Sequence, residues 1–250
     1  MTGSVHVEKV GERIVLLEID SPPMNALGVA MRATFMAALD QVEADDTIRA
    51  IVVTGRGRAF CSGDDLKNTR PDGDELAGFG HLLARLDATR APVIAAVNGW
   101  CVGGGFELTL CCDIRIASTE ARFVAAGVNV GLMASAYRLP RLIGVSRAKA
   151  MLLTGLPHDA ETAERFGLVT AIYPPEGLRA AAIALAERVA SRAPLSIEAT
   201  KRIAGRAPDL SPEEAALLQA AELARLRRSN DHRAALAAFR EKRDPEFTRS

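Results

Sequence analysis

The sequence predicts an α/β fold followed by a purely helical C-terminal part, and three observations support this prediction. Strand-like and helix-like segments alternate as far as Tyr173, a pattern typical of helices packed on a parallel sheet. From Glu176 onward the pattern is helical and is broken only near prolines and at a polar turn. Hydrophobic residues make up 48% of the 250 residues, which is enough to bury a sizeable core.

The individual elements follow from hydrophobic periodicity and from turn residues. Apolar, β-branched runs predict strands, which we expect at residues 13–19, 48–54, 92–97, 113–117 and 168–173. Apolar residues at helical spacing predict helices, which we expect at residues 29–42, 75–89, 146–153 and 160–166. Asn25 is expected as a turn or N-cap residue before the first of these helices. In the C-terminal part, Ser211 as N-cap and Pro212 at the first helical position predict the start of another helix.

Charge and hydropathy exclude several classes of protein. Lysine and arginine number 31, and aspartate and glutamate also 31, so the formal net charge is zero. This balance gives no long-range attraction to nucleic acid or to anionic membranes. The N-terminal residues show no signal or transit peptide pattern, and the most apolar window, residues 91–112, contains Asn98, Glu107 and four glycines. We therefore expect a cytoplasmic protein that binds neither nucleic acid nor membrane.

The cysteines do not indicate a metal site. Cys61, Cys101, Cys111 and Cys112 lack C-x-x-C spacing, and the histidines are scattered along the chain. We interpret the four cysteines as small buried hydrophobic residues and predict no metal.

The segment from Pro92 to Ala117 carries most of the functional information. It predicts a buried strand, a turn of three glycines at residues 103–105, a short helix that contains Glu107, and a second strand. Glycines let the backbone approach a ligand because they have no Cβ, and unpaired N–H groups at a helix N-terminus can hold a negative oxygen. A carboxylate among apolar residues costs several kcal/mol unless it has a partner or a function. We therefore predict an oxyanion site with Glu107 as its acid–base group.

A second glycine-containing loop, residues 61–65, follows the strand expected at residues 48–54. If that strand neighbours the one at residues 92–97, both loops open at the same edge of the sheet. One N–H group from each loop could then converge on a single oxygen. Tight turns without a ligand are the alternative interpretation.

Several ordered segments resemble the crotonase superfamily, the enoyl-CoA hydratase/isomerase family. These segments are Asn25-Ala26-Leu27, AFCSGDDL at residues 59–66, the run of residues 92–118, LPRLIG at residues 139–144 and GLV at residues 167–169. The resemblance implies a core of repeated ββα units arranged as a spiral, at residues 1–193, which binds and processes the substrate. It implies a helical trimerisation region at residues 194–250, and a homotrimer or a dimer of trimers.

The resemblance also implies an enzyme that acts on an acyl-CoA thioester, with coenzyme A carried by the substrate and no separate cofactor. The oxyanion N–H groups are implied at Asp64 and Gly104, and the acid–base role at Glu107. Coenzyme A contacts are implied at Asn25, Ala26, Leu27, Ser62, Gly63, Asp65 and Leu66, and in the C-terminal part at Phe239, Lys242 and Phe247. Since the Asp64 carboxylate would disfavour a nearby anion, we expect it to point away or to be neutralised by Lys67.

The sequence departs from the family's hydratases at one position. Those enzymes use two glutamates; Glu107 matches the first, whereas the second falls on Gly127. The loop after Gly131 is also shortened and lacks the acid that some isomerases of the family use. Glu107 is then the only acid placed in the catalytic cavity, and we expect the absent side chain at Gly127 to leave room for a bulkier acyl group.

This departure leaves alternatives open. A 1,3 proton shift needs only one carboxylate, so double-bond isomerisation is slightly favoured over hydration by Glu107 alone. A non-catalytic acyl-CoA-binding protein is the alternative from another class, and it would have no use for Glu107. An RNA-binding member would need a basic helical face, which the neutral charge does not favour.

Three further polar residues are interpreted as structural. We expect His81 on a helix surface, Asp113 as a hydrogen-bond acceptor, and Tyr137 in the core beside Leu139, with a pocket hydrogen bond from Tyr137 as the alternative.

Overall fold

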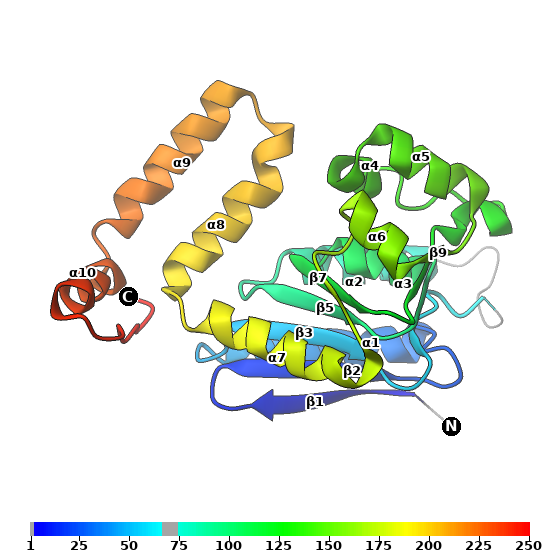
Figure 1. Ribbon diagram of the computed structural model, residues 1–250, viewed down its shortest axis with the longest axis horizontal. Helices are drawn as coiled ribbons and strands as arrows, with labels where there is room; N and C mark the ends of the chain where they lie inside the picture. Colours follow the sequence, from blue (N-terminus) through cyan, green and yellow to red (C-terminus); the bar gives the residue numbers. More distant parts are fainter. Residues whose placement is uncertain (1–2, 67–74) are drawn as a thin grey trace.

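The computed structural model describes residues 3–66 and 75–250, and the chain forms two sheets covered by helices (Figure 1). The strands are β1 (Ser4–Val10), β2 (Ile14–Asp20), β3 (Ala50–Gly55), β4 (Ala59–Cys61), β5 (Val93–Val97), β6 (Trp100–Val102), β7 (Ile114–Ser118), β8 (Arg122–Val124), β9 (His158–Asp159) and β10 (Ile172–Tyr173). The larger sheet has the order β1-β2-β3-β5-β7-β10 and the smaller sheet the order β4-β6-β8-β9. Strands β2, β3, β5, β7 and β10 pair in parallel, and β1 is antiparallel to β2.

The helices follow the strands along the chain. They are α1 (Val29–Ala44), α2 (Glu75–Asp87), α3 (Gly104–Leu110), α4 (Arg138–Ile143), α5 (Val145–Thr154), α6 (Ala160–Phe166), α7 (Pro175–Ala190), α8 (Pro194–Arg206), α9 (Pro212–Leu226) and α10 (Asn230–Glu241), with short 3-10 helices η1 (Ala126–Val130) and η2 (Ala207–Asp209).

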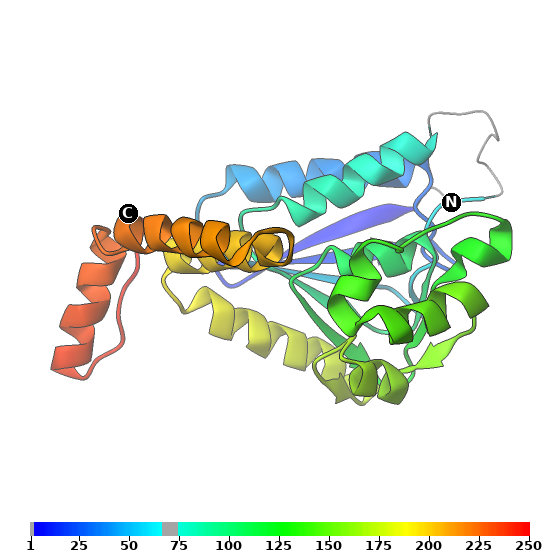
Figure 2. The same ribbon diagram turned by 90° about the horizontal axis from the view of Figure 1, so that it is seen from above.

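The central strands β2, β3 and β5 of the larger sheet are buried on both faces. Because alternate residues of a strand point to opposite faces, β2 and β3 send one set of apolar side chains toward α1 and α2 and the other toward α7. Phe35 of α1 and Leu82 of α2 are fully buried on the first side, and Ala186 of α7 on the second. Figure 2 shows α1 and α2 on one side of this sheet and α7 on the other. Apolar burial on both sides explains why the strands are almost continuously hydrophobic.

The predicted α/β fold with a helical C-terminal part is confirmed, and most element ends shift by a residue or two. The strand expected at residues 168–173 is wrong, because only Ile172 and Tyr173 pair with β7. The N–H groups of Leu168 and Val169 instead donate to Ala163 O at the end of α6. Strand β1 is absent from the expected elements, since it is an edge strand with a largely exposed face.

The C-terminal helices extend away from the sheets (Figure 1). Helix α9 starts with the expected cap: Ser211 Oγ accepts from Glu214 N, and Pro212 is the first helical residue. No residue of α9 is buried. Within the described ranges, no helix is long and apolar enough to cross a bilayer.

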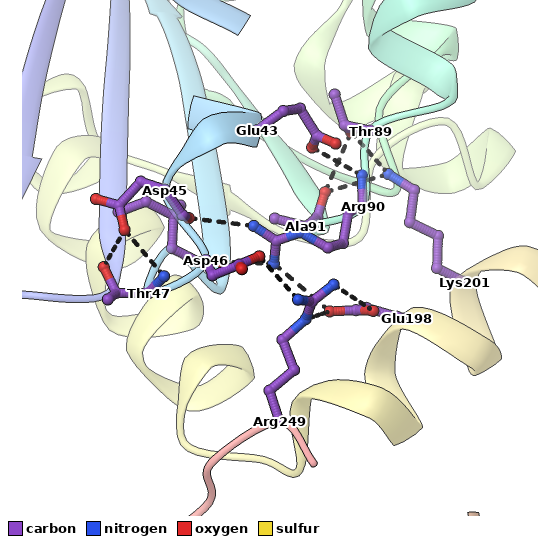
Figure 3. Close-up of polar contacts among 11 residues, drawn as sticks. Glu43, Asp45, Asp46, Thr47, Thr89, Arg90, Ala91, Glu198, Lys201 and Arg249 are labelled. Carbon is purple, nitrogen blue, oxygen red and sulfur yellow. Dashed lines mark hydrogen bonds and ion pairs between the residues drawn. The ribbon is translucent and has the colours of Figure 1, made fainter. Parts of the chain in front are cut away.

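A polar network fastens α8 and the end of the chain to the core (Figure 3). Arg249 Nε donates to Glu198 Oε1 of α8 at 2.8 Å, and Arg249 Nη1 donates to Asp46 Oδ1 at 2.8 Å. Arg90 Nη1 lies 3.5 Å from the same Glu198 oxygen. Lys201 Nζ of α8 donates to Thr89 Oγ1 at 3.0 Å. We refer to Arg90, Glu198 and Arg249 as the tail cluster.

Candidate active site

Two glycine-containing loops meet at one edge of the smaller sheet. They follow β4 and β6, which pair in parallel with Cys61 opposite Cys101. A Cβ on Gly63 would lie 2.4 Å from Gly104 N, so the two backbones are in contact. Gly63 has a φ of +83°, a conformation that L side chains rarely adopt. The strands β3 and β5 that lead into this region are neighbours, as expected.

The N–H groups predicted to hold an oxyanion lie on these two loops. Gly104 is the first residue of α3 and Gly103 is its N-cap, with φ 52°. Among the described residues, neither the N–H of Gly104 nor that of Asp64 is bonded to an acceptor. First-turn N–H groups have no partner within their own helix. Both groups are therefore available to a ligand, although their role stays a prediction.

Glu107 lies in the first turn of α3, where the helix dipole favours a carboxylate. Its carboxylate is held on one side: Oε1 accepts from Ser135 N and, at 3.3 Å, from Ser135 Oγ. Ser135 is buried and has a φ of 60°. Ser135 lies in the shortened loop that follows η1, where no motif or periodic pattern of the sequence indicates its contact with Glu107.

The loop that carries Ser135 packs directly on Gly127. A Cβ on Gly127 would lie 2.9 Å from Ala134 N and 3.0 Å from Leu132 O. Leu132 N also donates to Gly127 O at 2.8 Å. The loop therefore fills the space where a side chain at residue 127 would lie, and room for a bulkier acyl group stays a prediction.

The Asp64 carboxylate is neutralised by an arginine. Arg32 Nη1 of α1 donates to Asp64 Oδ1 at 2.7 Å, and their side chains are only 6% and 13% exposed. Asp65 N donates to the same oxygen at 2.9 Å. The expected partner, Lys67, lies outside the described residues. Arg32 lies on the face of α1 that also buries Phe35. An arginine among the apolar residues of a helix was therefore the sequence feature that could have indicated a buried acidic partner.

The two segments predicted to bind coenzyme A lie side by side. Leu27 N donates to Gly63 O at 2.7 Å, and Ala26 and Gly63 form a parallel bridge. Asn25, a turn residue as expected, is buried, and its Nδ2 donates to Ala59 O at 2.7 Å. Leu27 is also fully buried. In this structure Asn25 and Leu27 therefore support the loop from inside, while Ser62 and Asp65 are half-buried and Leu66 is exposed.

The C-terminal residues implied for coenzyme A are not brought to Glu107 within one chain. Lys242 caps α10, Phe239 is 84% exposed, and Phe247 O accepts a hydrogen bond from Arg49. Helix α10 lies at the opposite end of the molecule from α3 (Figures 1 and 2). A role for these residues in binding to a neighbouring subunit's site stays a prediction.

The expectation that Tyr137 lies in the core is wrong. Its side chain is 60% exposed rather than in the core, and its hydroxyl lies 3.5 Å from Asp209 Oδ2. Because the shortened loop runs straight into α4, Tyr137 faces a cavity of about 500 Å³ between α4 and α8. Asp113 accepts from Val93 N at 2.7 Å, and His81 is exposed on α2, as expected.

The cysteines are buried, as expected, and burial raises the pKa of the Cys61 and Cys111 thiols to about 12. The pKa of Cys101 is also well above its ordinary value because of burial. They remain protonated at neutral pH and do not supply a thiolate nucleophile. In the part of the chain that the structure describes, no group of three or more histidine, cysteine or acidic residues could hold a metal ion.

Comparison with known proteins identifies the family of this chain. The family model for enoyl-CoA hydratase/isomerase matches residues 9–250. The chain is 36% identical to the (E)-benzylidenesuccinyl-CoA hydratase of Thauera aromatica, over 96% of this chain and 97% of that protein. It is 34% identical to the 2,3-dehydroadipyl-CoA hydratase of Escherichia coli, over 94% of this chain and 95% of that protein.

Solved structures agree as well. The crystal structure of an enoyl-CoA hydratase from Bacillus anthracis superposes with a TM-score of 0.96 at 28% identity, over 99% of this chain and 100% of that chain. The enoyl-CoA hydratase of Mycobacterium smegmatis gives a TM-score of 0.91 at 29% identity, over 97% of this chain and 98% of that one.

The fold and the matches over nearly the full chain define an acyl-CoA enzyme of the crotonase superfamily. The chain belongs to the enoyl-CoA hydratase/isomerase family.

Proposed function

We propose that this enzyme transfers a proton on an enoyl-CoA thioester through Glu107 while the N–H groups of Asp64 and Gly104 hold the thioester oxygen. The contact between Gly63 and Gly104 is the observation that supports the proposal. It brings the N–H groups of Asp64 and Gly104, which have no acceptor among the described residues, onto two loops that touch, and Glu107 lies in the same first turn as Gly104. Removing one such donor typically costs about 10²–10³-fold in rate.

Double-bond isomerisation is the reaction that this arrangement supports best. Glu107 removes a proton from Cα of a 3-enoyl thioester, and the electron pair moves onto the thioester oxygen to form a dienolate. The same carboxyl group returns the proton at Cγ, which gives the 2-enoyl thioester. One carboxylate performs both transfers, and general acid–base catalysis of this kind contributes about 10²–10⁴-fold.

Hydration by Glu107 alone is the second candidate, and the names of the relatives from Thauera aromatica and Escherichia coli favour it. Here Glu107 takes a proton from water, the resulting hydroxide adds to Cβ, and the carboxyl group delivers its proton to Cα.

Two substrates distinguish these reactions. Purified protein is given a 3-enoyl-CoA or crotonyl-CoA, and the absorbance of the conjugated enoyl thioester is followed. An increase with 3-enoyl-CoA supports isomerisation, and a decrease with crotonyl-CoA supports hydration. Glu107→Gln should abolish either signal, whereas Glu164→Gln, an exposed change on α6, should not. No signal from either substrate would favour a non-catalytic acyl-CoA-binding protein.

The proposal extends to binding and assembly. Coenzyme A would lie along residues 25–27 and 62–66, and Lys242 and Phe247 would come from a neighbouring subunit. The exposed apolar residues of α9 and α10 support self-association, because Leu217 is 72% and Phe239 84% exposed. We propose that the assembly is a homotrimer or a dimer of trimers, as the resemblance to the family implies. Light scattering should then give three or six times the 26.6 kDa mass of one chain. The protein would work in the cytoplasm without a further cofactor.

A further inference from the structure

We propose that Ser135 is the positioning residue of Glu107, and that it directs both proton transfers to a single carboxylate oxygen, Oε2. The proposal rests on the proposed function, in which Glu107 carries the proton. Its starting point is the pair of donors, Ser135 N and Ser135 Oγ, that both reach Glu107 Oε1.

Two donors on one oxygen define where a proton can bind. A carboxylate oxygen has two lone pairs, and both lone pairs of Oε1 are engaged by Ser135. A proton on Oε1 would displace one of these hydrogen bonds, whereas Oε2 has no hydrogen-bond partner among the described residues. Oε2 is therefore the oxygen that takes and returns the proton, and Ser135 holds the carboxylate in one rotamer between the two transfers.

The backbone conformation at Ser135 allows both of its hydrogen bonds to Glu107. Its φ of 60° lies in the left-handed region, which residues other than glycine, asparagine and aspartate rarely adopt. This conformation turns both the N–H and the hydroxyl toward Glu107 while Ser135 O accepts from Leu139 N at the start of α4. Unusual backbone conformations persist where the surrounding structure enforces them, and they concentrate at functional sites.

Gly127 is what lets the loop reach this position. Ala134 N, adjacent to Ser135, lies 2.9 Å from where a Cβ of residue 127 would be. Any side chain at this position would push Ala134, and with it Ser135, away from Glu107. The absence of a side chain at Gly127 and the hydrogen bonds from Ser135 to Glu107 are thus two parts of one arrangement.

Ser135→Ala tests the hydroxyl alone, because alanine keeps the Cβ, the backbone N–H and the backbone conformation. We expect kcat to fall about 10- to 100-fold, the range for a hydrogen bond to a charged group, with KM changed less than about twofold. A fall in kcat with KM nearly unchanged is the result that a residue that only packs would not give.

Gly127→Ala tests the loop without touching either partner. It should lower kcat at least as much as Ser135→Ala, again with KM changed less than about twofold. Gly205→Ala is the matched control, because a Cβ there meets nothing within 4 Å, and it should leave kcat and KM unchanged. Thermal unfolding of each variant separates these effects from loss of fold.

A readout without turnover separates this proposal from the proposed function. The ¹³C resonance of the Glu107 carboxyl group, assigned with Glu107→Gln, should change its chemical shift at fixed pH in both Ser135→Ala and Gly127→Ala, because the carboxylate loses a hydrogen bond. If wild-type protein turns over neither substrate but this change occurs, the proposed reaction fails and the positioning role stands. If kcat, KM and the Glu107 resonance are all unchanged in both variants, Ser135 only packs and the proposal is wrong.

Discussion

At the residue scale, the Arg32–Asp64 ion pair explains how an acid can follow Gly63 beside a proposed oxyanion site. The pair is buried, with 2.7 Å between Arg32 Nη1 and Asp64 Oδ1. Arg32 compensates the charge from the side of α1, and its guanidinium also lies 5.9 Å from the centre of the Phe79 ring. The Asp64 N–H is therefore presented next to a neutralised carboxylate rather than a free anion.

We expect Arg32→Met to be strongly destabilising, because it leaves the Asp64 charge buried without its partner. The loss should be about 3–5 kcal/mol in the free energy of unfolding, measured in urea. Asp64→Asn in the same chain removes the buried carboxylate charge that Arg32→Met leaves unpaired, and it should restore part of the stability. Equal stability of Arg32→Met and the double variant would show that the pair does not act through charge.

The sequence could not predict this pair, although it did predict that Glu107 lies beside the glycine turn. Glu107 and the glycine turn are adjacent in the chain, so their juxtaposition follows from local structure. Arg32 and Asp64 meet only because α1 packs against the loop after β4. Proximity in sequence suggested Lys67, and the choice of partner is a property of the tertiary fold.

The buried thiols make the free energy of unfolding depend on pH. Burial raises the pKa of Cys61 and of Cys111 from 9.0 to about 12. Between these values the unfolded chain has lost thiol protons that the folded protein keeps. The free energy of unfolding should therefore fall above about pH 9, by about 1.4 kcal/mol per pH unit for each thiol. Cys111→Ala should show a shallower decline between pH 9 and pH 12, and an unchanged slope would contradict this account.

At the element scale, the site depends on two strands that bring two glycine loops into contact. Alternating strands and helices made the adjacency of β3 and β5 predictable, since successive parallel strands tend to be neighbours. The path of the shortened loop after Gly131 was not predictable, because no periodic pattern fixes an irregular segment. That is why Ser135 was missed and Tyr137 was placed in the core.

Gly104→Ala should disrupt the contact between these loops. The new Cβ would lie 2.5 Å from Phe79 Cζ and 3.1 Å from Gly63 Cα, so the start of α3 must shift. If the Gly104 N–H stabilises the enolate, kcat should fall about 10²–10³-fold. Phe79→Leu in the same chain shortens the obstructing side chain and should recover part of the loss.

The control for this change is Gly80→Ala on α2. A Cβ there meets nothing within 4 Å, and alanine favours the helix by about 0.5–1 kcal/mol. It should leave kcat unchanged and raise stability slightly. Wild-type kcat in Gly104→Ala would contradict the expected displacement of the Gly104 N–H by the new Cβ.

At the scale of the whole molecule, the tail cluster links the C-terminal part to the core. Glu198 accepts from Arg249 near the end of the chain and lies 3.5 Å from Arg90, which follows α2. Arg90 Nη1 also donates to Ile48 O at 3.0 Å, which ties the cluster to the segment before β3. Segments far apart in sequence are thus joined at one buried carboxylate (Figure 3). Their sequence separation explains why only the helical character of this region was predictable.

We expect Glu198→Ala to release the end of the chain while the core stays folded. The loss leaves two arginines without their shared acceptor and should cost about 1–3 kcal/mol. Limited trypsin digestion should then cleave after Arg243 or Arg249 faster than in wild-type protein. Glu222→Ala is the matched control: Glu222 of α9 also accepts from two arginines, Arg202 and Arg225, but its side chain is 26% exposed and those of its partners are 50% and 45% exposed. An exposed pair contributes about 0–1 kcal/mol, so this variant should digest like wild type. Equal digestion of the two variants would mean that burial of the cluster does not hold the tail.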